Sequence, residues 1–398
     1  MTGGLALYRW AGAVAASCAL LLSVCASQAA QPTVGTIKSP PANGEPEISQ
    51  YLTFLTALAT DEEANLILSP SGIGESLQML AEGVDDASQS QLEGLVEALG
   101  QAAEHANGTW NATMQSASLL VYSGISIRES YQQSISSQFA AITLVADDIE
   151  RRQAIENELQ DRLKTPYSLD EMLSSAVGSD INIISLNAFE NGWSPPFDPA
   201  LTSKATFFNR DGGQSEVDMM SRSGMFALVR SEGLSVVEVP YHDSEYSALF
   251  GLPDSVNGNR HQWEQWLDVM DRFDEMATYQ SLQLKLPRFS IAADLQLNDQ
   301  LEDAGITAIF DPRQVSLERM FTPAQDAFVG PIAHRAYLEI DEDGTKAGSA
   351  TIISIFGSLP EQPAENELIF NKPFWMAIRE HRSGTIHFLA LVRTLSQD

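Results

Sequence analysis

The sequence has almost no cysteine and little lysine. Its two cysteines, Cys18 and Cys25, lie in an apolar segment near the N-terminus, so no disulfide can join parts of the remaining chain. Lysine supplies six of the 23 basic residues, which stand against 53 acidic residues and leave a formal net charge of −30. Nucleic acid phosphates and anionic lipids need a basic partner, so this charge argues against both. The 44% hydrophobic content excludes a disordered polyanion and predicts a folded protein stabilised by packing.

The short motifs of common enzymes and metal sites are also missing. There is no Gly-x-Ser-x-Gly elbow, no His-Glu-x-x-His, no phosphate-binding loop and no dinucleotide fingerprint. The acidic run 341–343 lacks the alternate spacing of a calcium loop and is typical of a strand end followed by a turn. Histidines stand at positions 105, 242, 261, 334, 381 and 387, without ligand spacing to a cysteine or carboxylate. The sequence therefore predicts no metal and no cofactor. A hydrolase built from scattered Ser, His and Asp is a distant alternative.

The first 46 residues have the composition of an export signal followed by a tether. An uncharged apolar run at 11–24 is too short to cross a bilayer comfortably, and small residues follow it. We expect residues 1–30 to be a removable signal peptide, and residues 31–46, rich in Pro, Gly, Ser and Thr, to be a flexible linker. The mature chain is then extracellular or periplasmic. A competing hypothesis makes Cys25 the lipidated first residue of a lipoprotein, although the residue before it is bulkier than such motifs favour.

Residues 47–398 are predicted to form one domain, because no second linker, internal repeat or low-complexity tract interrupts them. Apolar residues at helical spacing predict helices around 48–58, 77–80, 92–99 and 152–163. Alternating or continuous apolar runs predict strands at 116–121, 181–186, 234–239, 282–286 and 336–340. Early helices followed by strands with helices between them indicate the α+β class.

A segment near the C-terminus, 344–355, combines small residues with high β-propensity. Alternate positions carry no charge, so this face can enter a core if the segment becomes a strand: Thr345, Ala347, Ser349, Thr351, Ile353 and Ile355. Lys346 is the only charge in the segment, and it falls on the opposite face. Taken by itself, the segment also fits an ordinary surface loop with a hydrophobic tip.

Ordered blocks of sequence surround this segment. It is preceded by Ile-Asp-Glu-Asp-Gly-Thr at 340–345 and followed by Phe-Asn-Lys-Pro-Phe at 370–374. Further blocks stand at 65–70, 77–80, 192–197, 219–226, 252–254, 286–289 and 333–336. Together they resemble the serpins, a family of serine protease inhibitors, in the order that the family has them. The resemblance covers residues 47–392, which is nearly the whole predicted domain.

The resemblance implies a single-domain serpin fold with three β-sheets, about eight to nine helices and an exposed reactive-centre loop at 342–367. It implies a suicide inhibitor rather than an enzyme. A serine protease attacks the loop and forms an acyl-enzyme, and insertion of the loop into the central sheet then carries the protease across the molecule. The runner-up is a non-inhibitory serpin-like binding or structural protein whose loop is only cleaved. Such relatives usually carry proline, charged or bulky residues on the inserting face. Thr345, Ala347 and Ser349 are none of these.

Particular residues acquire roles from the resemblance. The hinge consists of Glu342, Gly344, Thr345, Ala347, Ser349 and Thr351, and the breach and shutter of the sheet contain Ser69, Pro70, Trp193, Arg288 and His334. By analogy with the family, Arg288 and Glu342 are expected to form a salt bridge. Several positions depart from the family, two of them in the shutter. Gly72 stands where Ser is usual and removes a hydroxyl that would help to hold the sheet closed. Either Asn187 or Ser185 aligns with the Asn that partners the shutter histidine.

The attacked bond is predicted by counting from Glu342. About seventeen residues further on, the usual family interval for a loop that inserts fully, the chain reads Ser358-Leu359. A small bait residue suits an elastase-like or subtilisin-like protease, whereas a shift to Phe356-Gly357 suits a chymotrypsin-like one. No Lys or Arg lies between Ala347 and Leu359, which argues against a trypsin-like target. We expect the inhibitor to be a monomer.

Overall fold

The structure is a computed structural model of the chain. It describes residues 54, 64–100, 114–122, 126–138, 142–145, 181–255, 260–322, 328–330, 332–346 and 366–396. The chain divides into two units, 1–35 and 36–398, and every described residue belongs to the second. The expected signal peptide, the linker and the helix at 152–163 lie outside the described residues. So do the hinge residues Ala347, Ser349 and Thr351 and both candidate bonds, Phe356-Gly357 and Ser358-Leu359.

The described residues form three sheets with helices packed on them, which confirms the α+β class and the three expected sheets. Helices are α2 (Pro70–Ala81), α3 (Asp86–Gly100), α4 (Glu129–Gln138), α7 (Arg260–Met276) and α8 (Asn298–Asp303), with 3-10 turns η3 (Pro199–Leu201) and η4 (Ala308–Phe310). Among the described helices, none is long and apolar enough to span a membrane.

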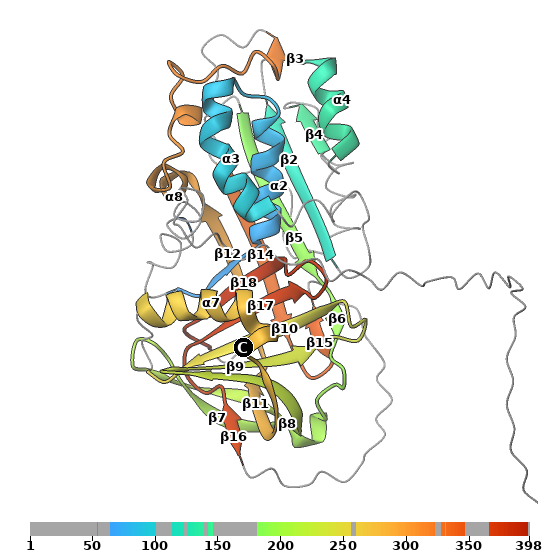
Figure 1. The fold of residues 1–398 in the computed structure, drawn as a ribbon, viewed down its shortest axis with the longest axis vertical. Coiled ribbons are helices and arrows are strands. Elements are labelled where there is room, and N and C mark those ends of the chain that lie inside the picture. The colour runs from blue at the N-terminus through green and yellow to red at the C-terminus, as the bar shows by residue number, and fades with distance from the viewer. Residues whose placement is uncertain are drawn as a thin grey trace, which may run out of the picture. The chain divides into compact units, whose positions relative to one another are not determined.

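A seven-stranded sheet runs through one half of the molecule (Figure 1). Its strand order is β4-β2-β5-β14-β15-β6, with β12 on the other side of β14. The bounds are β4 (Ile142–Val145), β2 (Met114–Tyr122), β5 (Ile181–Phe189), β14 (Ile332–Ile340), β15 (Gly344–Lys346), β6 (Asn191–Gly192) and β12 (Phe289–Gln296). The predicted strands at 116–121, 181–186 and 336–340 are therefore confirmed.

A nine-stranded sheet forms the other half, in the order β1-β18-β17-β10-β9-β8-β11-β16, with β7 on β8. The bounds are β1 (Leu66–Leu68), β18 (Ile386–Val392), β17 (Phe374–Glu380), β10 (Tyr246–Pro253), β9 (Leu234–Pro240), β8 (Gln214–Ser231), β11 (Thr278–Pro287), β16 (Glu367–Ile369) and β7 (Ser203–Phe208). A small third sheet pairs β13 (Phe321–Thr322) with β3 (Ser126–Ile127). The predicted strands at 234–239 and 282–286 are confirmed as parts of β9 and β11.

Helix α2 touches both large sheets. It begins sharply because Ser69 is its N-cap, whose hydroxyl accepts the Gly72 N–H at 3.1 Å, and because Pro70 occupies the first turn, where its missing N–H costs nothing. Its apolar face packs on β5 and β2 of one sheet and on β18 of the other, while α3 covers its outer side (Figure 1). Leu77 and Leu80 are fully buried, as their helical spacing predicts. The start of α2 is therefore the point at which the two sheets meet.

Candidate functional site

The seven-stranded sheet is closed at one end and forked at the other. In the closed part, β14 runs parallel to β5 and pairs with it directly, from Ile332 opposite Ile183 to Ala336 opposite Asn187. Beyond Ala336 the strands separate, and β15 lies between them. It pairs with β14 through Thr345 opposite Ile340 and with β6 through Thr345 opposite Asn191. The beginning of the small-residue segment is thus already a strand of this sheet.

A tight acidic turn joins β14 to β15. The Asp341 carboxylate accepts the backbone N–H groups of Asp343 at 2.9 Å and Gly344 at 3.1 Å, as an Asx turn does. Gly344 is required by space, because a Cβ there would lie 2.1 Å from the carbonyl oxygen of Asn191. The interpretation of the acidic run as a strand end and a turn is therefore confirmed.

Thr345 is fully buried. Its hydroxyl is hydrogen-bonded to the Tyr241 hydroxyl at 2.6 Å, and Tyr241 stacks on Trp193 with ring centroids 4.5 Å apart. Burial raises the pKa of Tyr241 well above its usual range, so its hydroxyl keeps its proton. The Trp193 indole N–H donates to the Asp341 carbonyl at 2.9 Å. The hinge is thereby tied to the sheet through side chains as well as through the strand ladder.

Glu342 lies beside this aromatic pair and is nearly buried. Its carboxylate accepts the Thr202 hydroxyl at 2.7 Å, and its carbonyl accepts the Phe197 N–H at 2.9 Å. The expected partner Arg288 does approach, but its guanidinium is 3.9 Å from the carboxylate and its side chain is 54% exposed. At this distance, and with the arginine more than half exposed to solvent, the ion pair contributes little. The structure therefore brings the expected pair together, while the shorter contact is to Thr202.

The shutter lies in the closed part of the fork, where β14 passes the start of α2. His334 is fully buried opposite Ser185, and its Nε2 accepts the Ser69 N–H at 2.9 Å. Burial lowers the pKa of His334 to about 3, so the ring is neutral at ordinary pH. Pro70 begins the helix immediately beyond. The predicted shutter residues Ser69, Pro70 and His334 therefore lie together, and Ser185 is the strand neighbour of the histidine.

Gly72 has a role that the sequence did not reveal. A Cβ at this position would lie 2.0 Å from the Asn187 side-chain oxygen, so the missing side chain is what admits the Asn187 amide between α2 and β5. The expectation that Gly72 merely removes a hydroxyl is incomplete, because that residue also creates space. Asn187 stands opposite Ala336 in the last pair of the closed ladder, directly at the fork.

Substitution of Gly72 by Ala is expected to destabilise the protein by about 1–3 kcal/mol, because the added methyl overpacks the shutter against Asn187. Urea denaturation of the intact protein measures this change. The double variant Gly72→Ala/Asn187→Ala is the control, since removal of the amide restores the space. If the double variant is destabilised by the full sum of the two single variants, the steric explanation is wrong.

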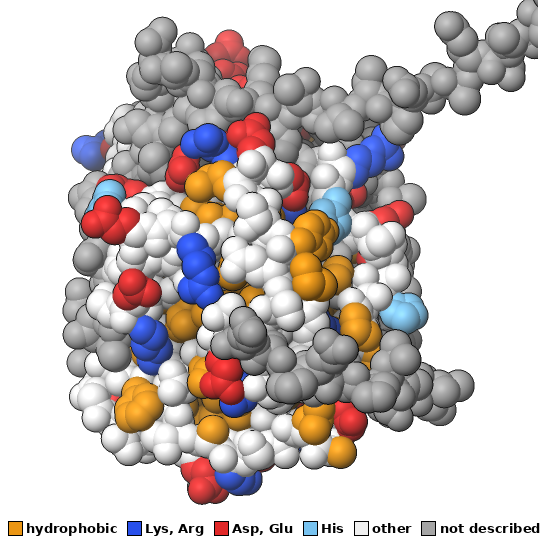
Figure 2. Space-filling model, turned by 60° about the horizontal axis from the view of Figure 1, so that its bottom comes forward, with side chains coloured by type: hydrophobic (Ala, Val, Ile, Leu, Met, Phe, Trp, Pro, Cys, Tyr) orange, Lys and Arg blue, Asp and Glu red, His pale blue; other side chains and the backbone are white. Residues whose placement is uncertain are grey.

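The far end of the loop is held in the other sheet. β16 runs parallel to β11, with Glu367 opposite Gln283, and the Lys285 ammonium lies 3.0 Å from the Glu367 carboxylate. The Phe370 N–H donates to the Lys285 carbonyl at 2.9 Å. The chain thus leaves the seven-stranded sheet after Lys346 and joins the nine-stranded sheet at Glu367, at the end of the molecule that Figure 2 turns forward. The segment between these two anchors is the expected reactive loop.

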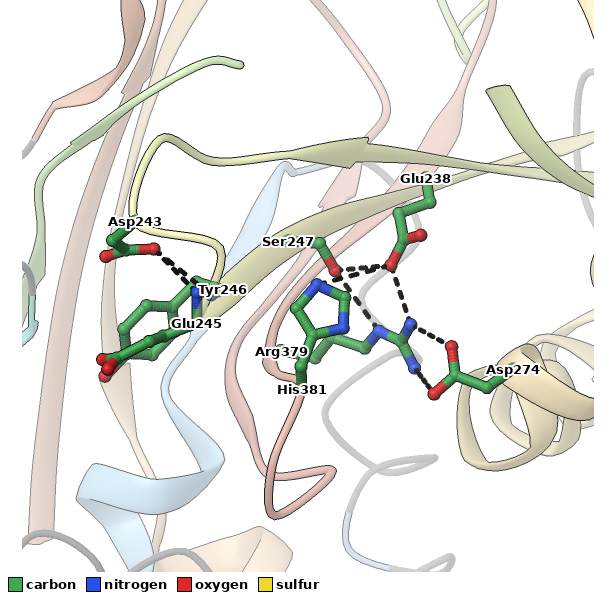
Figure 3. A network of polar contacts seen from close by, with 8 residues as sticks. All are labelled: Glu238, Asp243, Glu245, Tyr246, Ser247, Asp274, Arg379 and His381. Carbon is green, nitrogen blue, oxygen red and sulfur yellow. Dashed lines mark hydrogen bonds and ion pairs between the residues drawn. The ribbon is translucent and has the colours of Figure 1, made fainter. Parts of the chain in front are cut away.

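A second polar cluster lies between α7 and the nine-stranded sheet (Figure 3). Arg379 is buried and donates to Glu238 at 2.7 Å and to both oxygens of Asp274 at 2.6 and 3.1 Å. The hydrogen bonds from Arg379 lower the pKa of Asp274. The His381 ring lies 3.8 Å from Glu238. Arg379 thus joins carboxylates from β9 and α7, which makes this cluster a structural clamp. No group of three or more metal-ligating side chains occurs among the described residues.

Sequence reasoning missed Tyr241, Thr202 and Asn191. Each touches a hinge residue more than a hundred positions away, so no local spacing marks it. Trp193 and Glu342 were found only because they stand in blocks that resemble a family.

Comparisons with known proteins identify the family that has this fold. The sequence model of the family described as Serpin (serine protease inhibitor) matches residues 51–394. The chain belongs to the serpin family. Intracellular coagulation inhibitor 1 of Tachypleus tridentatus is 29% identical over 292 residues, covering 70% of this chain and 68% of that protein.

Solved structures show the same fold. Native protease nexin-1 with heparin has a TM-score of 0.72 at 21% identity, covering 88% of this chain and all of the other. Human thyroxine-binding globulin complexed with thyroxine also has a TM-score of 0.72, at 19% identity, covering 88% of this chain and 97% of the other. The similar proteins thus include a coagulation inhibitor and a thyroxine-binding globulin, so membership of the family does not by itself define what this chain does.

Proposed function

We propose that this serpin inhibits serine-type endopeptidases as a suicide substrate and that it is not an enzyme. The observation that carries the proposal is the position of β15 in the fork, where the hinge has entered the sheet and its first inward side chain, Thr345, is buried. A loop that a protease only cleaves does not need to begin as a strand of the sheet. The fork gives an inserting strand a template on both sides.

The strand register supports insertion of the whole hinge. If the β15 ladders continue with the same pairing, Ser349 lies between Asn187 and Ala336, and Thr351 lies between Ser185 and His334. These flanking residues are already opposite each other in the closed β5–β14 ladder. The two strands therefore have to move apart, but neither has to slide along its axis. Because the register does not change, each residue pair between β5 and β14 can be replaced in turn by pairs with the inserting strand.

The inward face of the hinge suits burial. Thr345 shares its face with Ile340, and along β14 the residues on that face, Leu338, Ala336 and His334, are all buried. The same alternation places Ala347, Ser349 and Thr351 on this face after insertion. These small uncharged side chains can be buried there without desolvating a charge. A protease held on the loop as an acyl-enzyme is then pulled along by the new strand before water completes the hydrolysis.

The loop, rather than the charge of the surface, is proposed to select the protease. On the face that Figure 2 shows, acidic, basic and hydrophobic side chains are interspersed among the residues that the structure describes. Since the described side chains on this face form no continuous patch of one sign, we propose that selection rests on the bait residue and the residues just before it. We propose Ser358-Leu359 as the attacked bond of an elastase-like or subtilisin-like target, and Phe356-Gly357 as the bond for a chymotrypsin-like one.

Mass spectrometry of the C-terminal fragment is expected to identify this bond. After attack by an elastase-like protease, the released fragment begins at Leu359. A fragment beginning at Gly357 supports the chymotrypsin-like alternative, and a start outside residues 356–360 contradicts both. In the same incubation, denaturing electrophoresis tests inhibition itself through the presence or absence of a covalent complex.

Export is part of the proposal. We propose that residues 1–30 are removed as a signal peptide, that residues 31–46 are a linker, and that the mature inhibitor acts as a monomer outside the cytoplasm, extracellular or periplasmic. The composition of the first 46 residues supports this. Attachment through a lipid on Cys25 remains the competing proposal.

A further inference from the structure

Two buried histidines flank the start of α2, one from each large sheet. His334 belongs to β14 and accepts the Ser69 N–H at 2.9 Å. His387 belongs to β18, and its Nδ1 lies 3.3 Å from the Ser71 hydroxyl. The hydroxyls of Ser69 and Ser71 are 3.2 Å apart. A continuous series of hydrogen bonds thus runs from the seven-stranded sheet, across the first turn of α2, to the nine-stranded sheet.

A β-bulge presents His387 to the helix. In the ladder between β17 and β18, Ile378 is opposite Phe388 and Arg379 is opposite Ile386, so His387 is the extra residue between two regular pairs. Bulges change the direction in which a side chain points. The His387 ring meets the Tyr246 ring edge-on, with centroids 5.6 Å apart, and is 7% exposed. The fold therefore places a buried imidazole against the helix that packs on the shutter.

The surroundings of His387 favour its neutral form. Burial lowers the pKa of His387 to about 4, and the Glu380 carboxylate on β17 opposes this shift. From β10 the ring faces the Tyr246 phenol, and from α2 it faces Ser71 and the positive end of the helix dipole. β1 contributes no titratable side chain. His334 lies at the far end of the two serines and is also neutral.

Within the described part of the chain, neither His334 nor His387 has the two hydrogen-bond acceptors that a protonated imidazole ring needs. A protonated imidazole has two N–H donors. Among the described residues, Nε2 of His387 and Nδ1 of His334 have no hydrogen-bond partner. Protonation in the closed state would therefore bury a charge and an unsatisfied donor beside the positive end of α2.

We propose that Ser71 and His387 form a proton-operated latch on the opening of the seven-stranded sheet. Neutral His387 holds Ser71 and the first turn of α2, and that turn holds His334 and β14 through the Ser69 N–H. In mild acid, His387 takes up a proton in any state in which its contact with Ser71 is broken. This proton uptake favours that state over the closed one. The latch regulates the sheet opening on which the proposed inhibition depends, but it acts in the intact protein without a protease.

The direction of the pH effect follows from the difference between the pKa of His387 in the closed state and its pKa in the open state. In the open state the ring has its ordinary pKa of about 6.5, and in the closed state that of His387 is about 4. The closed state therefore keeps its full stability above pH 6.5 and loses it as the pH falls toward 4. Between pH 7.5 and pH 5.0, His387 alone shifts the equilibrium toward opening by ~30-fold.

Unfolding rates of the intact protein in a fixed concentration of urea, at pH 7.5 and pH 5.0, test the latch. Other titrating groups contribute equally to the wild type and to His387→Leu. The ratio of the two rates is expected to be up to ~30-fold smaller in the variant, because one proton uptake is gone. His242→Leu is the control, since His242 is exposed, and its ratio should equal that of the wild type. Equal ratios in the wild type and His387→Leu overturn the proposal.

A second measurement applies even if His387→Leu does not fold. In the wild-type protein with 13C-labelled histidine, the ring signal that shifts most in Ser71→Ala is assigned to His387, because among the described histidines only His387 contacts Ser71 directly. This signal is expected to titrate below about pH 5. Titration near pH 6.5 overturns the latch. No protease is present in either experiment, so these results are independent of whether the protein inhibits one.

Discussion

Cutting the loop at Ser358-Leu359 is expected to raise the midpoint of thermal unfolding by more than ~10 °C. In the proposed mechanism, the freed segment continues β15 down the fork and completes two strand ladders. Its inward face then buries Ala347, Ser349, Thr351, Ile353 and Ile355. Full burial of the two isoleucines alone contributes about 3–6 kcal/mol, and the backbone groups gain partners on both sides. In a domain of this size ~1 kcal/mol shifts the melting temperature by roughly 1.4 °C, so the isoleucines alone give about 4–8 °C and the new backbone hydrogen bonds supply the rest.

The experiment compares melting curves of the intact protein and of protein cut by a protease that is then removed. A cut made outside the loop, in the linker 31–46, is the matched control, because it adds no strand to the sheet. If the loop-cut protein melts at the temperature of the intact protein, the loop does not insert. The non-inhibitory alternative then explains the protein better.

Thr345→Arg is expected to turn the inhibitor into a substrate. Thr345 is fully buried and hydrogen-bonded to Tyr241, so an arginine there would have to leave the sheet or bury an unpaired charge. A buried unpaired charge costs several kcal/mol, and each ~1.4 kcal/mol slows a step tenfold. Insertion slowed by ~100-fold or more loses the competition with hydrolysis of the acyl-enzyme. The protease then cleaves the variant and departs.

Lys346→Gln is the control for this variant. Lys346 is the next residue along β15, opposite Glu339, and the alternation of the strand puts it on the other face. The covalent complex is measured by denaturing electrophoresis after equal exposure to the protease. Thr345→Arg should lose the complex and Lys346→Gln should keep it. Equal loss in both variants would show that the assignment of inward and outward faces is wrong.

The contrast between these neighbours shows what the sequence could and could not reveal. Alternation alone predicted that Thr345 points inward, and the structure buries it. The sequence did not show that Thr345 is already in the sheet, because that depends on pairing with Asn191 and on the Tyr241 hydroxyl. These contacts join distant parts of the chain and leave no periodic signal.

The strand partner of Lys346, Glu339, is a second contact that the sequence did not reveal and that changes the expected effect of a substitution. From the sequence, Lys346 is an outward residue whose exchange for Glu looks harmless. The register places Glu339 directly opposite, so Lys346→Glu would set two carboxylates against each other and weaken the seat of the hinge. The strands themselves were predictable from apolar runs, but their pairing was not, because parallel neighbours such as β5 and β14 are far apart in the chain.

The central claim is that cleavage of the loop traps the protease. The most direct measurement is incubation of the intact protein with a panel of elastase-like, subtilisin-like and chymotrypsin-like proteases, followed by denaturing electrophoresis. The same proteases with a blocked active-site serine serve as controls. We predict a band at the summed mass of a protease and this chain without its C-terminal fragment, which is absent with the blocked enzyme. Loop cleavage by an active protease, with full recovery of its activity and no such band from any member of the panel, would contradict the account.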